Sequence, residues 1–307
     1  MGKGEQTLTF LIKEWVKEVQ GHFTSHQLDG ELDIRTPKEK GLRRVVIKQL
    51  CDDNKIQRVT GGVGAYRKVD TTALIMDWQS ADPKNIVSLK FPFGLEQFVK
   101  IFPKSILIVA GSKNEGKSLF MYDFTLKNMY HPLGIDLYNS ETGREQMKER
   151  LDNFDVEIPN PAPFRVFERY DNFADCIDPN RISVIDYLDL DSEVYMVGAE
   201  INHIFQKLDK GIAIIALQKP PSQTLYVKGV KKTISRDLAY GGGFTSKRAV
   251  LYLSLDSHIL KIVFCKNKAD AKINPNNMRW SFSVNDNGTK FLDIKRFYEE
   301  QQEDFGL

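Results

Sequence analysis

The feature that most constrains this chain is a glycine-rich octapeptide, GSKNEGKS at residues 111–118, which follows the apolar run Ile106 to Ala110. It fits the pattern GxxxxGK[ST], and a helix is predicted to begin near Lys117. In such a loop, backbone N–H groups surround phosphate oxygens, the helix N-terminus favours anions, and the lysine reaches the terminal phosphates. The sequence therefore predicts a strand–loop–helix unit that binds a nucleoside triphosphate.

Every residue of this loop is a candidate phosphate ligand: Gly111, Ser112, Lys113, Asn114, Glu115, Gly116, Lys117 and Ser118. The Ser118 hydroxyl is also a candidate ligand of Mg²⁺. Asp186 is a second metal candidate, because it ends the apolar stretch Ile182 to Ile185 as the carboxylate of a Walker B strand does. A nucleoside triphosphate and Mg²⁺ are thus the expected cofactors. Glu115 is unusual here, since it puts an acid among phosphate-binding groups.

Apolar strands that alternate with helices indicate an α/β domain over residues 96–295. Short, continuously apolar strands are typical of a mostly parallel sheet covered on both faces. The strand candidates are Ile106 to Ala110, Ile135 to Tyr138, Ile182 to Ile185, Ile212 to Leu217 and Ala249 to Leu253. The remaining divisions we expect are a small domain over 1–70, a linker over 71–95 and an acidic tail over 296–307.

The small first domain is predicted to be rich in helices. Apolar residues recur at helical spacing between Leu8 and Val19, and a short second helix fits His22 to Asp33. Thr36-Pro37 signals the start of a third helix, an N-cap hydroxyl before a proline. The apolar side of this third helix should carry Leu42, Val45, Val46 and Leu50.

Two short strands, Ile56 to Thr60 and Ala65 to Val69, flank a glycine-rich turn after these helices. Three helices followed by a basic hairpin resemble a winged helix-turn-helix domain. Between Arg35 and Lys68 ten Lys and Arg residues stand against three Asp and Glu residues. We expect this excess charge to contact DNA phosphates, through Arg43, Arg44, Lys48 and Arg67. The alternative is a protein-interaction module whose basic face is merely solvated.

The whole chain is nearly neutral, with 43 Lys and Arg against 41 Asp and Glu. This balance excludes a uniformly basic nucleic-acid coat, so DNA contacts must come from local patches. The three cysteines are far apart and lack metal-ligand spacing, which argues against a disulfide framework and a zinc site. No apolar run is long enough for a membrane span, and the first residues lack a signal-peptide core. A cytoplasmic protein without a membrane partner is expected.

Further stretches resemble the ATPase domain of DnaB-type replicative helicases, within the RecA-like superfamily. The matching residues are Ser140-Glu141 with Glu145-Gln146 and Arg150-Leu151, Asp186-Tyr187-Leu188-Asp189-Leu190, Ile214 to Gln218, Arg236-Asp237-Leu238 with Gly241 to Gly243, and Lys266-Asn267-Lys268. The resemblance covers about residues 95–295. It implies a RecA-like P-loop NTPase core that assembles into a ring or filament, with ATP between subunits.

The resemblance also implies catalytic roles beyond that of Lys117. Glu141 would activate the attacking water, although an acid favoured at a helix N-terminus is the simpler alternative. Gln218 would sense the γ-phosphate, while Lys266 and Lys268 would reach the nucleotide of the neighbouring subunit. Lys268 stands where the family has an arginine, so the planar fork is lost and hydrolysis is expected to be slow.

Residues 219–248 form a long polar segment, which we expect to be a loop with interleaved cations and aromatics. Such a composition suits single-stranded DNA, where backbone charge and base stacking supply the affinity. The candidate contacts are Tyr226, Lys228, Lys231, Lys232 and Arg236. The resemblance places a DNA-binding loop here as well. The alternative is a flexible, solvated loop.

Together these features predict an ATP-dependent DNA motor or DNA-organising ATPase that acts in replication or recombination. Its expected partners are DNA, further copies of itself and a replication protein. The alternative is a nucleotide-switched, DNA-binding initiator, loader or regulator without helicase activity. A third hypothesis is a filament-forming recombination accessory protein.

Overall fold

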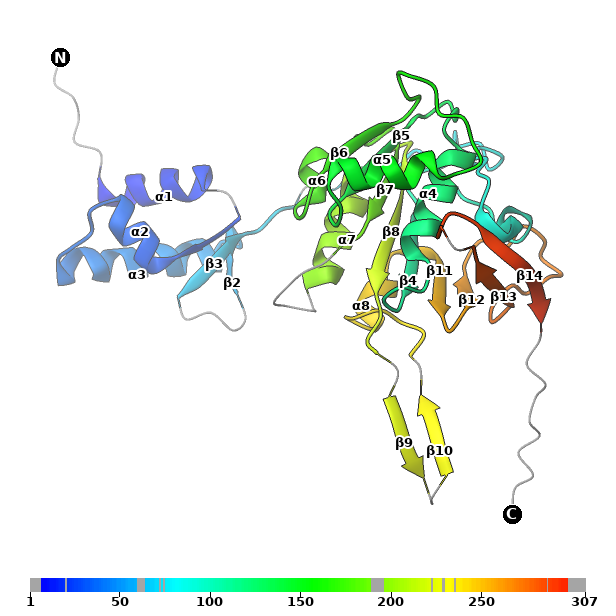
Figure 1. The fold of residues 1–307 in the computed structure, drawn as a ribbon. Coiled ribbons are helices and arrows are strands. Elements are labelled where there is room, and N and C mark those ends of the chain that lie inside the picture. The colour runs from blue at the N-terminus through cyan, green and yellow to red at the C-terminus, as the bar shows by residue number, and fades with distance from the viewer. Residues whose placement is uncertain are drawn as a thin grey trace. The chain divides into compact units, whose positions relative to one another are not determined.

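The computed structural model describes residues 7–19, 21–59, 64–71, 73, 75–188, 196–221, 223–227, 230–234, 236–285 and 287–297, the backbone alone for 223–227 and 230–234. The chain divides into two compact units, residues 1–81 and 82–307 (Figure 1). Among the described residues, the first unit has one buried hydrophobic cluster and the second unit has two.

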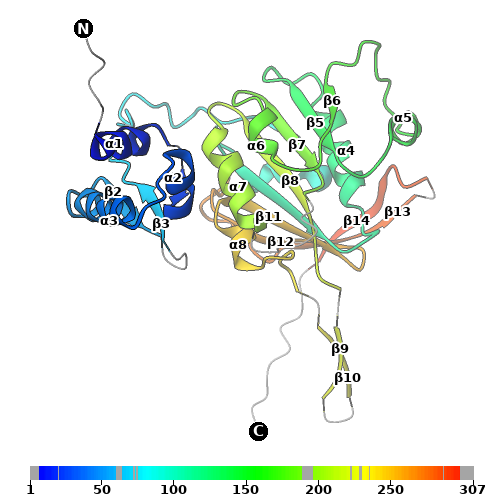
Figure 2. The ribbon, with the colours of Figure 1, turned by 90° about the vertical axis from the view of Figure 1, so that its left-hand side faces the viewer.

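The first unit packs its helices against a three-stranded antiparallel sheet of order β1-β3-β2. Figure 2 shows α1, α2 and α3 around strands β2 and β3 of this sheet. Its elements are α1 Leu8–Glu18, β1 His22–Thr24, α2 Ser25–Glu31, α3 Pro37–Asp52, β2 Ile56–Arg58 and β3 Ala65–Lys68. α3 begins as predicted. The Thr36 hydroxyl accepts from the Glu39 N–H at 3.3 Å, and the Glu39 carboxylate accepts from the Thr36 N–H at 2.9 Å. This reciprocal capping box fixes the start of the helix.

Two predictions for this unit are wrong in detail. Strand β1 lies within the segment expected to be helical, because Phe23 is buried there and pairs with Tyr66 of β3. On α3, Leu42 and Val45 are exposed, at 40% and 65% of their surface. The buried face instead carries residues at helical spacing, namely Arg43, Val46, Ile47 and Leu50.

The segment predicted as a linker, 71–95, belongs partly to the second unit. Ile75, Met76 and Trp78 are exposed, but Val87, Leu89, Phe91 and Leu95 are buried in the core of that unit. Asn128 fixes this segment by accepting from the Lys90 N–H at 2.8 Å and donating to the Lys90 carbonyl at 2.7 Å. The 3₁₀ helix η1 follows at Pro92–Gln97.

Apart from one separate two-stranded hairpin, the described strands of the second unit form a single nine-stranded sheet. Its order is β14-β13-β12-β11-β4-β8-β7-β5-β6. Strands β11 to β6 in this order are parallel, and β12 to β14 extend the sheet antiparallel. The strands are β4 Ile106–Gly111, β5 Ile135–Asn139, β6 Arg165–Glu168, β7 Ile182–Asp186, β8 Ile212–Gln218, β11 Ala249–Asp256, β12 Ile259–Cys265, β13 Arg279–Val284 and β14 Phe291–Phe297. The predicted α/β class with a mostly parallel sheet is confirmed.

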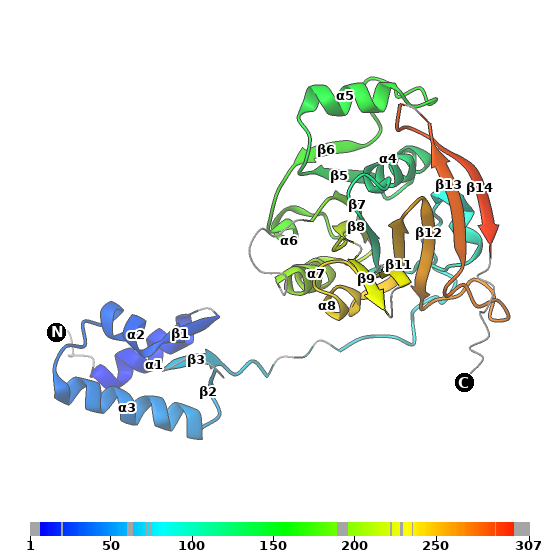
Figure 3. The same ribbon diagram turned by 60° about the horizontal axis from the view of Figure 1, so that its bottom comes forward.

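Helices cover both faces of this sheet, as continuously apolar strands require. Leu107 and Val109 of β4 pack into one cluster with α4 Lys117–Lys127, while Ile106 and Ile108 pack into a second cluster with α7 Met196–Lys207. Figure 3 shows α4 and α7 on opposite sides of the sheet. The shorter helices are α5 Arg144–Asp152, α6 Phe173–Cys176 and α8 Gly243–Ser246.

The polar segment predicted as a loop contains an antiparallel hairpin, β9 Gln223–Val227 and β10 Val230–Ile234, with Tyr226 opposite Lys231. Both ends of the hairpin segment are tied to the edge of the main sheet. The Lys219 N–H donates to the Gly111 carbonyl at 3.0 Å, and the Tyr240 N–H donates to the Gln218 carbonyl at 3.0 Å.

The predicted acidic tail starts inside a strand, because β14 continues to Phe297; residues 298–307 lie outside the described part of the chain. Among the described residues, none of the helices has both the length and the apolar character that crossing a bilayer needs.

Candidate nucleotide-binding site

The glycine-rich loop connects the end of β4 to the start of α4, and both of its glycines, Gly111 and Gly116, are sterically required. Gly116 has a φ of 87°, in the left-handed region that side chains rarely adopt. A Cβ at Gly116 would also lie 3.3 Å from the Phe291 ring, and a Cβ at Gly111 would lie 2.6 Å from Cγ of Lys117. The loop therefore curls back over its own strand, with its backbone close to the lysine.

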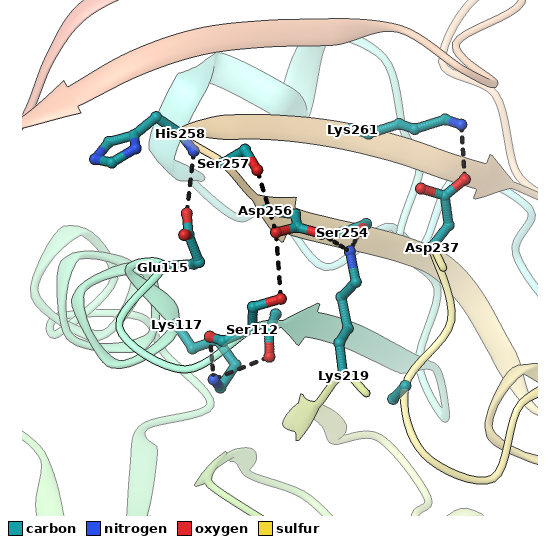
Figure 4. A network of polar contacts seen from close by, with 12 residues as sticks. Ser112, Glu115, Lys117, Lys219, Asp237, Ser254, Asp256, Ser257, His258 and Lys261 are labelled. Carbon is teal, nitrogen blue, oxygen red and sulfur yellow. Dashed lines mark hydrogen bonds and ion pairs between the residues drawn. The ribbon is translucent and has the colours of Figure 1, made fainter. Parts of the chain in front are cut away.

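Lys117 lies along the inside of the loop. Its Nζ donates to the carbonyls of Gly111 at 3.0 Å and Ser112 at 2.8 Å (Figure 4). Burial lowers the pKa of Lys117, while the charges of Asp186 and Glu141 act in the opposite direction. The loop thus holds a partly buried cation where the sequence predicts phosphate binding.

The structure brings together the two predicted metal-binding residues, Ser118 and Asp186. The Ser118 hydroxyl donates to Oδ1 of Asp186 at 3.2 Å, and Asp186 is only 1% exposed. Among the described residues, Oδ2 of Asp186 has no hydrogen-bond partner. Burial raises the pKa of Asp186 to about 6. A buried carboxylate with a vacant oxygen beside a hydroxyl fits Mg²⁺, which prefers oxygen ligands and supplies the missing positive charge.

A cavity of roughly 520 Å³ opens over the loop, and it contains most of the predicted site. From the loop it is lined by Lys113, Asn114, Gly116, Lys117 and Ser118. Glu141, which follows β5, and Gln218, which ends β8, line it too. The carboxyl ends of parallel strands meet at one edge of the sheet, which is why β5 and β8 deliver both side chains here.

Arg150 of α5 also lines the cavity, and it is absent from the predicted site residues. It is part of the Arg150-Leu151 match, but its position depends on which face of α5 packs on the sheet. Tyr122 lies beside it at the cavity wall. Burial raises the pKa of Tyr122 to about 12, and the side chains of Thr142 and Arg150 act against that shift.

The other wall comes from elements that the sequence did not reveal. It is formed by His258 at the β11–β12 turn and by Val284, Asn287, Gly288 and Thr289 at the β13–β14 turn. The sequence carries no motif here, because the antiparallel strands β12 to β14 lack a distinctive pattern.

Glu115, the acid within the phosphate loop, makes a contact of its own. Its carboxylate accepts a hydrogen bond from the backbone N–H of His258 at 3.0 Å (Figure 4). Glu115 therefore links the loop to the β11–β12 turn.

Lys266 and Lys268 do not line this cavity. β12 runs antiparallel to β11, so that Cys265 pairs with Leu251, whereas the phosphate loop lies at the other end of β11, where Leu255 pairs with Gly111. Both lysines follow the end of β12 and thus lie at the opposite edge of the sheet. Their action on the nucleotide of a neighbouring subunit stays a prediction.

One predicted DNA contact in the first unit is corrected. Arg43 is buried, at 8% exposure; its Nη1 donates to the Ser25 carbonyl at 3.1 Å, and its Nε lies 3.3 Å from Oδ1 of Asp29. Its charge is used inside the fold. Arg44 and Lys48 are exposed, and they line a groove between α3 and the hairpin to which the buried Arg43 also contributes.

Of the remaining predicted DNA contacts, Arg67 and Arg236 are exposed, and Nη2 of Arg67 donates to Oε1 of Gln57 at 2.7 Å. Tyr226, Lys231 and Lys232 lie in β9 and β10, of which the structure describes the backbone. Lys228 lies outside the described residues. Arg236, in the second unit, does not line the cavity.

Comparisons with protein-family models and with curated proteins find no match. Among solved structures, the chain is similar to the crystal structure of a KaiC-like protein from the hyperthermophilic archaeon Pyrococcus horikoshii OT3. The two are 14% identical, the similarity covers 69% of this chain and 100% of that chain, and the TM-score is 0.49.

Proposed function

We propose that this chain is a magnesium-dependent ATPase of the RecA-like superfamily, with a DnaB-type arrangement of its site. The observation that carries the proposal is the convergence of Lys117, Ser118, Glu141 and Gln218 on one cavity, with buried Asp186 3.2 Å from the Ser118 hydroxyl. Ser118 and Asp186 would hold Mg²⁺, which supplies positive charge to the phosphate oxygens.

Each side chain has a definite task in the proposed hydrolysis. Lys117 neutralises charge on the terminal phosphates, and Gln218 donates a hydrogen bond to the γ-phosphate. Glu141 accepts the proton of the attacking water. The water oxygen bonds to the γ-phosphorus, and the bridging P–O bond breaks so that ADP leaves with its electron pair.

Steady-state ATPase assays with and without single-stranded DNA test this function. We expect magnesium-dependent hydrolysis that DNA stimulates and that Lys117→Ala abolishes, because the loop loses its cation. Activity or stimulation that survives in Lys117→Ala would mean that the turnover comes from another site or a contaminant.

The active form we propose is a homo-oligomeric ring or filament, since Lys266 and Lys268 cannot serve the cavity of their own chain. Mixing provides the test. Lys117→Ala and the double variant Lys266→Ala, Lys268→Ala should each be inactive, and mixed oligomers should regain activity where an intact loop meets an intact lysine pair. Failure of mixing to restore activity would contradict action in trans.

DNA is the substrate that we propose for the motor. The order α1-β1-α2-α3-β2-β3 with its β1-β3-β2 sheet supports a winged helix in the first unit, where Arg44 and Lys48 are available for duplex phosphates. The β9–β10 hairpin is the proposed contact for single-stranded DNA. We propose that the motor acts in replication or recombination.

A nucleotide-switched initiator, loader or regulator is the second candidate. Lys268 favours it, because an ammonium lacks the planar fork of an arginine finger and turnover should then be slow. A strand-displacement assay separates the two, since a switch binds ATP and duplex DNA without unwinding it. Electron microscopy of complexes with single-stranded DNA separates a ring from the filament of a recombination accessory protein.

A further inference from the structure

Lys219, the residue after Gln218 at the end of β8, is a buried lysine. It is 2% exposed, and its Nζ donates to Oδ2 of Asp256 and to Oγ of Ser254, each at 2.9 Å. Burying an ammonium is costly unless a partner charge and hydrogen bonds compensate it. Desolvation makes such a pair costly to bury, so its position in the fold points to a role beyond packing.

The partner of Lys219 contacts the phosphate loop. Oδ1 of Asp256 accepts from the Ser112 hydroxyl at 3.2 Å (Figure 4). The backbone adds two hydrogen bonds at the same place. The Ser112 N–H donates to the Leu255 carbonyl at 3.2 Å, and the Lys219 N–H donates to the Gly111 carbonyl at 3.0 Å. β11 and β8 flank β4 in the sheet, so the first two loop residues are held from both sides.

This arrangement has an electrostatic problem that the lysine solves. Asp256 brings a negative charge to a loop whose proposed ligand is a polyanion, and like charges a few ångströms apart repel strongly in a poorly solvated site. The Lys219 ammonium, 2.9 Å from the carboxylate, cancels that charge. Asp256 can then hold Ser112 without opposing phosphate.

A second ion pair nearby serves as a natural comparison. Lys261 of β12 lies 2.7 Å from Asp237, and their side chains are 15% and 39% exposed. Figure 4 shows this pair apart from the loop residues. It resembles the Lys219–Asp256 pair chemically but has no described contact with the phosphate loop.

We propose that Lys219 is a positioning residue for nucleotide binding: it neutralises Asp256, which in turn holds Ser112 and the start of the phosphate loop. The proposal rests on the proposed nucleotide-binding function and adds to it a residue that does not itself touch the phosphates.

Calorimetric titration of the full chain with magnesium and a slowly hydrolysed ATP analogue tests this, with thermal unfolding measured alongside. Lys219→Met should raise the Kd on the order of 10-fold, because Asp256 is left as a bare anion beside the loop. Adding Asp256→Asn to Lys219→Met should return the Kd to within about 3-fold of the parent, since Asn removes the charge and still accepts from Ser112. Lys261→Met is the matched control and should leave the Kd unchanged.

Three results would overturn the inference: an unchanged Kd in Lys219→Met, a double variant no better than Lys219→Met, or an equal loss in Lys261→Met. If Lys219→Met does not fold, Asp256→Asn alone decides. It keeps the Ser112 contact and leaves a cation, so its Kd should equal or fall below that of the parent, and a 10-fold rise contradicts the proposal. An unaltered chain that binds no nucleotide would instead refute the proposed function itself.

Discussion

The hydroxyl of Ser118 and the carboxylate of Asp186 meet at 3.2 Å, although 67 residues separate them in the chain. The loop after β4 and the end of β7 bring them together across β8, which lies between these two parallel strands, and Asp186 is buried at the contact. Burial disfavours the ionised carboxylate and raises its pKa to about 6, while the Ser118 hydrogen bond and the Lys117 charge oppose this shift. The site is thus built at some expense in stability.

Asp186→Asn should separate activity from stability. The amide keeps the shape but cannot supply a full negative charge to magnesium, so we expect ATPase activity to fall at least about 100-fold. Without magnesium, Asp186→Asn should unfold at a higher temperature than the parent. Its free energy of unfolding should be larger by on the order of 1–3 kcal/mol at pH 7, because the variant buries no charge at this position. Calorimetric melting and phosphate release measure the two effects. A variant that is both inactive and less stable would contradict the argument.

Arg150→Ala should impair turnover, because a guanidinium at the cavity wall can stabilise charge that develops on the phosphates. We expect kcat to fall about 10- to 100-fold, with partial recovery in Arg150→Lys. Arg144→Ala is the control, since Arg144 lies on the same helix but is exposed and pairs with Glu145. Equal losses in both variants would indicate damage to α5 rather than a role at the site.

Glu115→Gln should be nearly silent despite its place in the phosphate loop. Its carboxylate accepts from the His258 N–H, and a glutamine oxygen can accept the same bond. Nucleotide affinity should stay within about 3-fold of the parent. Binding more than 10-fold tighter in Glu115→Gln would show that the acid faces the phosphates instead.

Two adjacent arginines of α3 should have different effects. Arg43→Ala removes the partner of Asp29 inside the fold and should lower the free energy of unfolding by about 1–3 kcal/mol. The double variant Arg44→Ala, Lys48→Ala should instead weaken duplex DNA binding. The slope of log K against log salt concentration should become shallower by about two, and the free energy of unfolding should stay unchanged. Denaturant titrations and binding isotherms at several salt concentrations distinguish these outcomes. A salt slope unchanged in the double variant would remove α3 from the DNA interface.

His131 should make stability fall in mild acid. Burial lowers the pKa of this histidine below its usual 6.5, and the backbone of Ser88 opposes the shift. The unfolded chain therefore binds the proton more readily than the folded chain, so stability is complete above about pH 6.5 and is lost as the pH falls below it. Urea unfolding of the parent and of His131→Asn at pH 7.5 and 5.5 measures this.

The sequence predicts candidate site residues where a short stretch of neighbouring residues carries the whole motif. The octapeptide at 111–118 and the strand that ends in Asp186 are each recognisable by themselves. Parallel strands of one sheet then place the two motifs at the same edge. Arg43 could not be separated from Arg44 in the same way, because which of the two faces inward depends on how α3 packs against α1, α2 and β2. The Lys219–Asp256 contact is less predictable still, since it exists only once β8 and β11 both flank β4.

The roots of the β9–β10 hairpin at Gly111 and Gln218 have an evolutionary consequence. Since both ends are fastened to the sheet, the strands between them can grow, shrink or change composition while the chemistry beneath stays as it is. Under the proposed function, related proteins could bind different partners through this hairpin while hydrolysing the same nucleotide.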